Sequence, residues 1–531
     1  MTVPAGHTGT KHDTPGRAAT APNQTRSVAA SNRGEEETMP APFRLYNTLS
    51  RRVEDFTPLQ PGHIGLYVCG MTVYDLCHAG HARAMVIFDT FVRYLRHREW
   101  SVKFVRNFTD VDDKIIRRAA DLGIEPLELA QQQIDYFHAD VAALGLMDPD
   151  EEPRVSTSID DIIAMIERLI RNDKAYAADG SVWYDVRSFH SYGALSGQKV
   201  DELRNPDVGD GKRSPTDFAL WKAVKPGEPS WPSPWGPGRP GWHIECSAMA
   251  STCLGDTFDI HGGGLDLVFP HHENEIAQSE GASGCTYARW WMHNGLLTMP
   301  GGRKMGKSEG NAFTIRDLLA LFPAESIRLY YLQNHYRSPL PWDQDALPAA
   351  LGMVCRLYEA REVAESMKGQ EKAEQVAKDL GEDAQAVLEM SAAFEERFHA
   401  ALDDDFNTSK ALSYAFELAR AVNRFSNHKR ARKRGGPVVA GALRCFQLVS
   451  DALGLLGSDV STFMEEVKNK RLAAMGIEKS HIENLLEERI VARKAKDWGR
   501  ADAIRDELEA NHIVVMDTGA GVDWRVRITT T

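Results

Sequence analysis

From Phe43 onward, apolar strand-like runs alternate with amphipathic helical segments, and this alternation most limits the fold. Residues 63–70 form a short apolar run, residues 79–98 have apolar positions at helical spacing, and residues 102–110 are again strand-like. Strand, helix and strand follow one another within about fifty residues, which indicates a βαβ unit. We therefore predict a Rossmann-like α/β fold with a parallel sheet that binds its ligand at the carboxyl ends of the strands.

The rest of the chain divides around this core, because 531 residues are too many for a single hydrophobic core. Residues 151–238 contain a helical segment, a hairpin signal at Asp179-Gly180 and a proline-rich loop, and are interpreted as an insertion. The predicted parts are residues 1–42 as a disordered extension, 43–150 and 239–300 as two halves of the nucleotide-binding domain, 151–238 as its insertion, 301–345 as a lysine-containing loop and connection, 346–475 as a helical bundle, and 476–531 as a small C-terminal α+β subdomain.

Charge and cysteine usage narrow the class of protein. The net charge of −13 argues against a protein coated in nucleic acid, although it permits a local basic groove. Seven scattered cysteines favour a reducing compartment with thiols available for metal or chemistry. No apolar run approaches the ~20 residues that span a bilayer. We expect a cytoplasmic monomer, and we favour a disordered extension over a transit peptide for the first 42 residues, which lack an amphipathic pattern.

Two basic motifs suit phosphate chemistry. His78 and His81 stand three residues apart at the start of the predicted helix, where they could hold a polyphosphate or simply cap the helix. Lys304 and Lys307 lie in the glycine-rich stretch PGGRKMGKSEGN, which could be a surface turn or could neutralise phosphate charge during a reaction. Chance seldom supplies both motifs together, so the pair favours nucleotide chemistry.

A second set of residues suits a metal ion. Cys69 ends the first predicted strand, and a helix predicted to begin at Pro270 would place His271 and Glu275 on one face. Together with Cys246 they form a plausible zinc set, although no tight C-x-x-C pair exists and two buried cysteines are the alternative. His272, three residues before Glu275, is a rival ligand.

Three further groups have a functional and a structural interpretation. Asp110, Asp112 and Asp113 could bind Mg²⁺, but capping of the following helix is favoured. A basic stretch suits phosphate contact or a solvated loop, and it comprises Lys429, Arg430, Arg432, Lys433 and Arg434. Candidates for stacking on nucleic-acid bases, with core packing as the alternative for each tryptophan, are Trp498, Arg500 and Trp524.

Several of these motifs form a known pattern. Residues 78–81, HAGH, and 304–308, KMGKS, resemble the HIGH and KMSKS signatures of class I aminoacyl-tRNA synthetases, each with one departure, Ala79 and Gly306. Residues 67–89, 105–119, 238–250, 259–280 and 304–311 resemble the cysteinyl-tRNA synthetase family in order and spacing. The resemblance extends from Phe43 to about Arg527, and it implies that residues 301–345 hold the KMSKS-type loop and contact the tRNA stem and that residues 476–531 bind the anticodon.

The resemblance implies an activity and a set of site residues. It implies ATP-dependent activation of L-cysteine and transfer to tRNA(Cys), with Mg²⁺ accompanying ATP. It implies one zinc ion per chain, held by Cys69, Cys246, His271 and Glu275, and catalytic roles for His78, His81, Lys304 and Lys307. The residues that it implies for substrate and adenylate binding are Gly70, Thr109, Trp242, His261, Gly262, Gly263, Gly264, Asp266 and Ser308.

A pocket zinc would explain how such an enzyme rejects serine. An apolar pocket separates near-isosteres by only about 1–3 kcal/mol, whereas zinc prefers a soft thiolate to a hydroxyl. Selection at binding predicts that the chain has no separate editing domain. Two alternatives stay open: a ligase that couples cysteine to an amino-sugar inositol, against which residues 346–531 count, and a catalytically silent zinc-containing RNA-binding relative.

Overall fold

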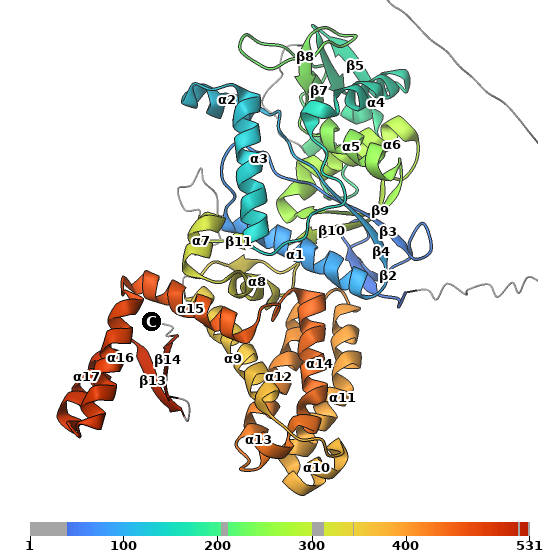
Figure 1. Cartoon of the computed structure of the whole chain (residues 1–531). Coiled ribbons are helices and arrows are strands. Elements are labelled where there is room, and N and C mark those ends of the chain that lie inside the picture. The colour runs from blue at the N-terminus through green and yellow to red at the C-terminus, as the bar shows by residue number, and fades with distance from the viewer. Residues whose placement is uncertain (1–39, 203–210, 300–312, 344, 519–520, 529–531) are drawn as a thin grey trace, which may run out of the picture. The chain divides into compact units, whose positions relative to one another are not determined.

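The computed structural model describes residues 40–202, 211–299, 313–343, 345–518 and 521–528. A parallel sheet with strand order β10-β9-β3-β4 is the framework of the first half of the chain (Figure 1). Its strands are β3 (His63–Val68), β4 (Ser101–Arg106), β9 (Phe258–Gly264) and β10 (Ala288–Asn294). All three pairings are parallel, so the predicted Rossmann-like sheet is confirmed.

Helix α1 (Ala79–His97) connects β3 to β4 and completes the predicted βαβ unit. Its apolar positions Ile87, Phe88 and Phe91 are buried, and each such side chain contributes about 1.5–3 kcal/mol when fully buried. At Gly262 of β9 an added Cβ would lie 2.5 Å from Phe88 Cε1, which shows how closely helix and sheet approach. The carboxyl ends of β3, β4 and β9 consequently meet beside the start of α1.

The predicted insertion contains an antiparallel sheet with strand order β5-β6-β7-β8. Asp179 and Gly180 both have positive φ, 52° and 76°, as a tight hairpin turn requires. The predicted hairpin is therefore confirmed. The strands are β5 (Ala175–Ala178), β6 (Ser181–Tyr184), β7 (Phe218–Ala223) and β8 (Gly238–Pro240), and the helices before and after them are α4 (Ile159–Arg171), α5 (Ile244–Leu254) and α6 (Glu273–Ser283).

The described chain after residue 345 is mainly helical, as predicted. The remaining helices before the C-terminal part are α2 (Asp113–Leu122), α3 (Pro126–Ala143), α7 (Ile315–Leu321), α8 (Ala324–Leu332), α9 (Ala346–Ser366), α10 (Ala373–Leu380), α11 (Glu382–Leu402), α12 (Thr408–Ser426), α13 (Ala431–Arg434), α14 (Gly436–Leu453) and α15 (Val460–Met475). Short strand pairs are formed by β1 (Arg44–Asn47) with β2 (Arg52–Asp55) and by β11 (Leu297–Thr298) with β12 (Leu340–Pro341).

The C-terminal part has its own hydrophobic cluster, in which Ile504, Leu508 and Trp524 are buried. It consists of α16 (Lys479–Lys494), α17 (Trp498–Ala510), β13 (Ile513–Thr518) and β14 (Gly521–Val526). The two strands pair antiparallel, so helix, helix and two strands follow one another as predicted. Among the described residues, none of the helices is long and apolar enough to cross a membrane.

Candidate active site and metal centre

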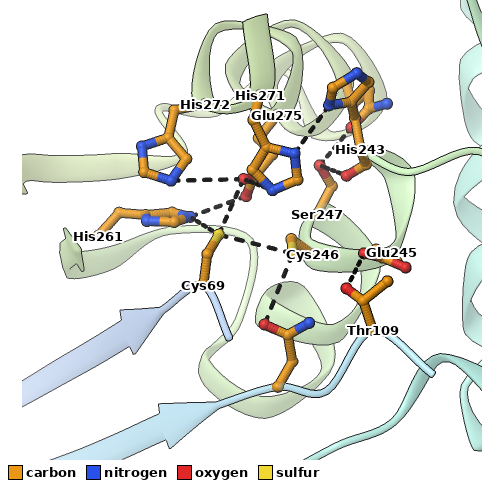
Figure 2. A network of polar contacts seen from close by, with 12 residues as sticks. Cys69, Thr109, His243, Glu245, Cys246, Ser247, His261, His271, His272 and Glu275 are labelled. Atoms are coloured by element: carbon orange, nitrogen blue, oxygen red, sulfur yellow. Dashed lines mark hydrogen bonds and ion pairs between the residues drawn. The ribbon is translucent and has the colours of Figure 1, made fainter. Parts of the chain in front are cut away.

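Four predicted metal ligands meet at the carboxyl edge of the sheet (Figure 2). Cys69 follows β3, Cys246 lies on α5, His271 lies just before α6, and Glu275 lies on α6. The two Sγ atoms are 3.7 Å apart, Cys69 Sγ lies 3.3 Å from Glu275 Oε1, and His271 Nε2 lies 3.0 Å from the same oxygen. One ligand atom from each residue lies within 4.8 Å of the others, so the cluster could hold a metal ion.

The predicted helix around these ligands is present from Pro270. A π-helical segment, Val268–His272, leads directly into α6 (Glu273–Ser283), and Phe269 is the residue within it that has non-helical angles. Phe269 has extended backbone angles (φ −140°, ψ 134°), in agreement with the bias against helical geometry before proline. His271 reaches Glu275 because this segment leads directly into the helix.

The rival ligand His272 belongs to a second, overlapping cluster. Cys69, His261, His272 and Glu275 also place one ligand atom each within 4.8 Å of the others. His261 Nε2 lies 2.9 Å from Glu275 Oε2, whereas His272 Nε2 is 4.0 Å from Glu275 Oε1. His272 Nδ1 is instead 2.8 Å from His293 Nε2. Glu275 therefore stands between two imidazole clusters, and only one of them includes both thiols.

The electrostatics of the cluster favour a thiolate at Cys246, whereas burial raises the pKa of the Cys69 thiol. Burial opposes ionisation of Cys246, but hydrogen bonding with Cys69 and the neighbouring His271 lower the pKa of this thiol to about 6. Burial likewise disfavours a charged His271, but the Glu275 carboxylate raises the pKa of this imidazole to about 10. The pKa of Glu275 lies well below its usual range despite burial, because the His261 and His271 imidazoles surround it. Since thiolates are the metal-binding form of cysteine, the cluster suits a soft cation.

A cavity of about 680 Å³ adjoins this cluster. The predicted residues that line it are Cys69, Gly70, His78, His81, Thr109, Trp242, Cys246, Gly264, Asp266 and His271. The Trp242 ring lies against that of His271, with 4.6 Å between centroids. The described lining does not include His261, Gly262 or Gly263, which are buried in β9.

His78 and His81 have the capping role that was one interpretation of their spacing, and both also line the cavity. The His78 side chain accepts a hydrogen bond from the Gly80 N–H at 3.1 Å, and His81 Nδ1 accepts one from the His78 N–H at 3.4 Å. Their rings stack with 3.7 Å between centroids, and both rings line the cavity. They cap α1 and at the same time face the space where a substrate would lie.

The predicted residues Lys304, Lys307 and Ser308 lie outside the described residues. The backbone that follows this loop is joined to the start of α1. The Ala79 N–H donates to the Phe313 carbonyl at 2.8 Å, and the Ile315 N–H donates to the Cys77 carbonyl at 3.0 Å. The chain after the lysine loop is thus held beside the two histidines.

In the acidic run before α2, the predicted capping role is confirmed for Asp112, whereas Asp110 accepts hydrogen bonds from the Ser156 N–H and hydroxyl. Asp112 accepts a hydrogen bond from the Lys114 N–H at 2.8 Å and is the N-cap of α2. Asp113 pairs with Lys222 at 2.7 Å and Arg239 at 2.6 Å. Partial burial opposes ionisation of Asp113, but the two cations lower its pKa to about 2.

Several site residues were not identified from the sequence. His243 Nδ1 lies 2.9 Å from His271 Nδ1, and the Tyr287 hydroxyl donates to Glu275 Oε2 at 3.1 Å. The Thr109 hydroxyl donates to the buried carboxylate of Glu245. His243 and Glu245 precede Cys246 closely in the stretch WHIEC, and that proximity was the available signal. Tyr287 has no such signal, because it reaches the site from a distant segment.

Models of known families match three parts of the chain. Residues 55–352 match "tRNA synthetases class I (C) catalytic domain", residues 397–457 match "DALR domain", and residues 479–525 match "Cysteinyl-tRNA ligase anticodon binding domain". The cysteine–tRNA ligase of Alkalilimnicola ehrlichii is 50% identical over 488 residues, 91% of this chain and 99% of that protein. The cysteine–tRNA ligase of Geobacter sulfurreducens is 48% identical over 492 residues, 91% of this chain and 100% of that protein.

The chain belongs to the cysteine–tRNA ligase family. Solved class I synthetases share the fold of this family member at much lower identity. A methionyl-tRNA synthetase of Mycobacterium tuberculosis bound by methionyl-adenylate has a TM-score of 0.56 at 15% identity, covering 74% of this chain and 92% of that one. A leucyl-tRNA synthetase (LeuRS) of Agrobacterium radiobacter has a TM-score of 0.53 at 12% identity, covering 77% of this chain and 86% of that one.

Proposed function

We propose that this chain activates L-cysteine with ATP to give cysteinyl-adenylate and then transfers the cysteinyl group to tRNA(Cys). The observation that carries the proposal is the buried cluster of two thiols, an imidazole and a carboxylate on the wall of a cavity that His78 and His81 also line. The Rossmann-like fold fits an ATP-binding role, and a metal held by the cluster would select a substrate that carries a thiol.

The first step needs positioning and charge neutralisation rather than a protein nucleophile. The substrate carboxylate attacks the α-phosphorus of ATP, and pyrophosphate leaves with its electron pair. We assign His78 and His81 to the phosphates on the cavity wall, and Lys304 and Lys307 to the charge of the departing pyrophosphate, with Mg²⁺ accompanying ATP. In the second step, a ribose hydroxyl of the tRNA end attacks the acyl carbon and AMP leaves.

The other cavity residues fit substrate binding. We assign Thr109, Trp242 and Asp266, which line the cavity next to the cluster, to the amino acid. His261 lies behind them against Glu275. We assign the adenylate to Gly70 and Gly264, which line the cavity, to Gly262 and Gly263, which support this edge from within β9, and to Ser308.

We propose that Cys69, Cys246, His271 and Glu275 hold one zinc ion. This set has two thiols, whereas the overlapping set with His261 and His272 has one, and zinc favours the softer set. When bound, zinc would offer the substrate sulfur a ligand position that a serine hydroxyl, protonated near neutral pH, fills poorly. A hydrogen bond between His243 Nδ1 and His271 Nδ1 would fix the His271 ring, so that His271 Nε2 is directed at the cluster.

Pyrophosphate exchange and tRNA charging test the proposed function. L-cysteine should drive ATP–pyrophosphate exchange, L-serine should not, and tRNA(Cys) should become charged. Exchange without charging, but with transfer to an amino-sugar inositol, would support the first alternative. Absence of exchange would support the silent RNA-binding alternative. The matched anticodon-binding model at residues 479–525 favours tRNA as the acceptor.

His78→Asn separates helix capping from catalysis. Asparagine is a good N-cap, so the melting temperature should change little. The shorter side chain withdraws from the cavity, and removal of one group that stabilises transition-state charge costs roughly 100- to 1,000-fold in kcat. Exchange kinetics and a thermal melt check this expectation. Unchanged kcat would show that His78 only caps α1.

Substitution of two tryptophans in the C-terminal part is expected to affect different properties, tRNA binding for one and stability for the other. Trp498 is 59% exposed, whereas Trp524 is 7% exposed and packs in the local core. Trp498→Ala should raise the KM for tRNA about 10-fold, since stacking on a base is worth about 1–3 kcal/mol, and should leave exchange intact. Trp524→Ala, the comparison variant, should lower the melting temperature. Equal tRNA kinetics in Trp498→Ala and the parent would contradict the stacking role.

Two arginines among the candidates for tRNA contact are already paired with carboxylates. Arg434 of the basic stretch pairs with Glu371 and Asp379, and Arg500 on α17 pairs with Glu488, so neither is assigned to tRNA. The other residues of the basic stretch are exposed and stay candidates for phosphate contact: Lys429, Arg430, Arg432 and Lys433.

We also propose that the enzyme acts in the cytoplasm and that it is a monomer. Light scattering of the purified protein checks the monomeric state.

A further inference from the structure

We propose that one face of helix α2 guides the single-stranded 3′ end of the tRNA into the cavity. The face carries Lys114, Arg117 and Arg118, which are called here the α2 stripe. The inference rests on the proposed function, because only a polynucleotide acceptor needs such a path.

The α2 stripe is a continuous face that starts at the cavity. Its three residues have i, i+3 and i+4 spacing and are exposed, whereas Ile115 and Ala119 on the opposite face are buried. At 1.5 Å per residue, the stripe extends about 6 Å along the helix. Lys114 lines the cavity, but Arg117 and Arg118 do not belong to its described lining.

The cations of the α2 stripe form no ion pair with a carboxylate among the described residues. Asp112 caps the helix, and Asp113 is paired with Lys222 and Arg239, so the two acids at the helix start are committed elsewhere. Among the described residues, no carboxylate lies within 4.0 Å of the three cationic groups. Arg117 Nε donates only to the backbone carbonyl of Asp113, at 3.2 Å.

An aromatic ring stands beside the first cation of the stripe. Lys114 Nζ lies 5.7 Å from the centroid of the Tyr74 ring, and Tyr74 also lines the cavity. Cationic groups that follow a backbone, combined with an aromatic face for a base, are the features that bind single-stranded nucleic acid without sequence preference.

The extent of the stripe favours a polynucleotide over ATP. The phosphates of ATP have a place within the cavity, near His78 and His81. A cationic face that continues outside the cavity fits a chain with one phosphate per nucleotide. The last ribose of the tRNA must enter the cavity to accept the cysteinyl group, so the preceding phosphates must lie along the way in, and Lys114 both lines the cavity and is exposed to solvent.

The test compares charging with exchange in the full chain. We expect Arg117→Gln/Arg118→Gln to lower kcat/KM for tRNA(Cys) charging at least 10-fold at low salt relative to ATP–pyrophosphate exchange, which uses no tRNA. Each lost contact with a single strand should reduce the slope of log(kcat/KM) against log[salt] by about 0.7, so the double variant should lose about 1.4. Lys114→Gln should likewise lower kcat/KM for charging relative to exchange.

Two further variants separate this role from a structural one. Asp121 is an exposed acid at the far end of the same helix, and its charge should repel the phosphates of the tRNA 3′ end. Asp121→Asn should therefore raise charging efficiency a few-fold at low salt. Lys225→Gln removes an exposed cation of the insertion that does not line the described cavity and should leave the ratio of charging to exchange unchanged.

The outcomes are distinct. An unchanged charging efficiency and salt slope in the double variant would overturn the inference. An equal loss in exchange and charging would also overturn the inference, because the stripe would then act on ATP. The proposed function would be unaffected by that outcome. If the unaltered chain shows no cysteine-dependent exchange, the proposed function itself fails.

Discussion

Cys246→Ser is expected to lose bound zinc and to raise the KM for L-cysteine roughly 100-fold or more, while the KM for ATP changes little. The Cys246 sulfur lies 3.7 Å from that of Cys69, so its loss removes one of the two soft donors. Without zinc, selection of cysteine over serine should fall to the roughly 10- to 200-fold that an apolar pocket supports.

Metal analysis and exchange kinetics with cysteine and serine check this prediction. Cys445→Ser is the matched control, because Cys445 is also buried but lies on α14, where its sulfur contacts the Ser391 carbonyl at 3.6 Å. The control should keep zinc and the parental KM. A zinc-free Cys246→Ser variant with the parental cysteine affinity would refute the proposed role of the metal.

Gly70→Ala is expected to reduce kcat/KM for exchange at least 100-fold. An added Cβ would lie 1.6 Å from the Asn107 carbonyl oxygen, so β3 and β4 must separate at their carboxyl ends. The Gly70 N–H also donates to Asn107 Oδ1 at 2.8 Å, and this bond would be strained or lost. Gly70 follows Cys69, so the shift moves a proposed metal ligand, and a 1 Å misplacement can cost about 100-fold in rate.

The same substitution should destabilise the fold by about 1–3 kcal/mol or more, as overpacking does. Gly352→Ala is the control, because an added Cβ there meets only Ile528 Cγ2, at 3.7 Å, on a helix. It should be neutral or stabilising by up to about 1 kcal/mol. Chemical denaturation and exchange assays of both variants measure the difference. Parental activity in Gly70→Ala would show that the strand ends tolerate separation.

The sequence was sufficient to predict the sheet and the four side chains that meet in the candidate metal cluster. The apolar runs before Cys69 and after α1 have strand composition, and the spacing of His271 and Glu275 places them on one side of a helix or of the turn that leads into it. The helical entry at Pro270 was also predicted, but its π-helical form was not, because no local pattern distinguishes that form from an ordinary first turn.

Other features depend on tertiary contacts that no local pattern encodes. Asn107 touches Gly70 only because β3 and β4 pair in parallel register. Trp498 and Trp524 have equal propensities in sequence, and packing alone decides that one is exposed and the other buried. His78 and His81 could be interpreted as caps or as phosphate ligands, and their geometry accommodates both roles.

X-ray absorption at the zinc edge of the purified protein tests the central claim most directly, because it reports the neighbours of the metal itself. We predict one zinc per chain with sulfur neighbours from Cys69 and Cys246, one further sulfur neighbour when L-cysteine is added, and no change with L-serine. A protein without zinc, or a spectrum that L-cysteine leaves unaltered, would contradict the proposal that this chain recognises its substrate through the thiolate.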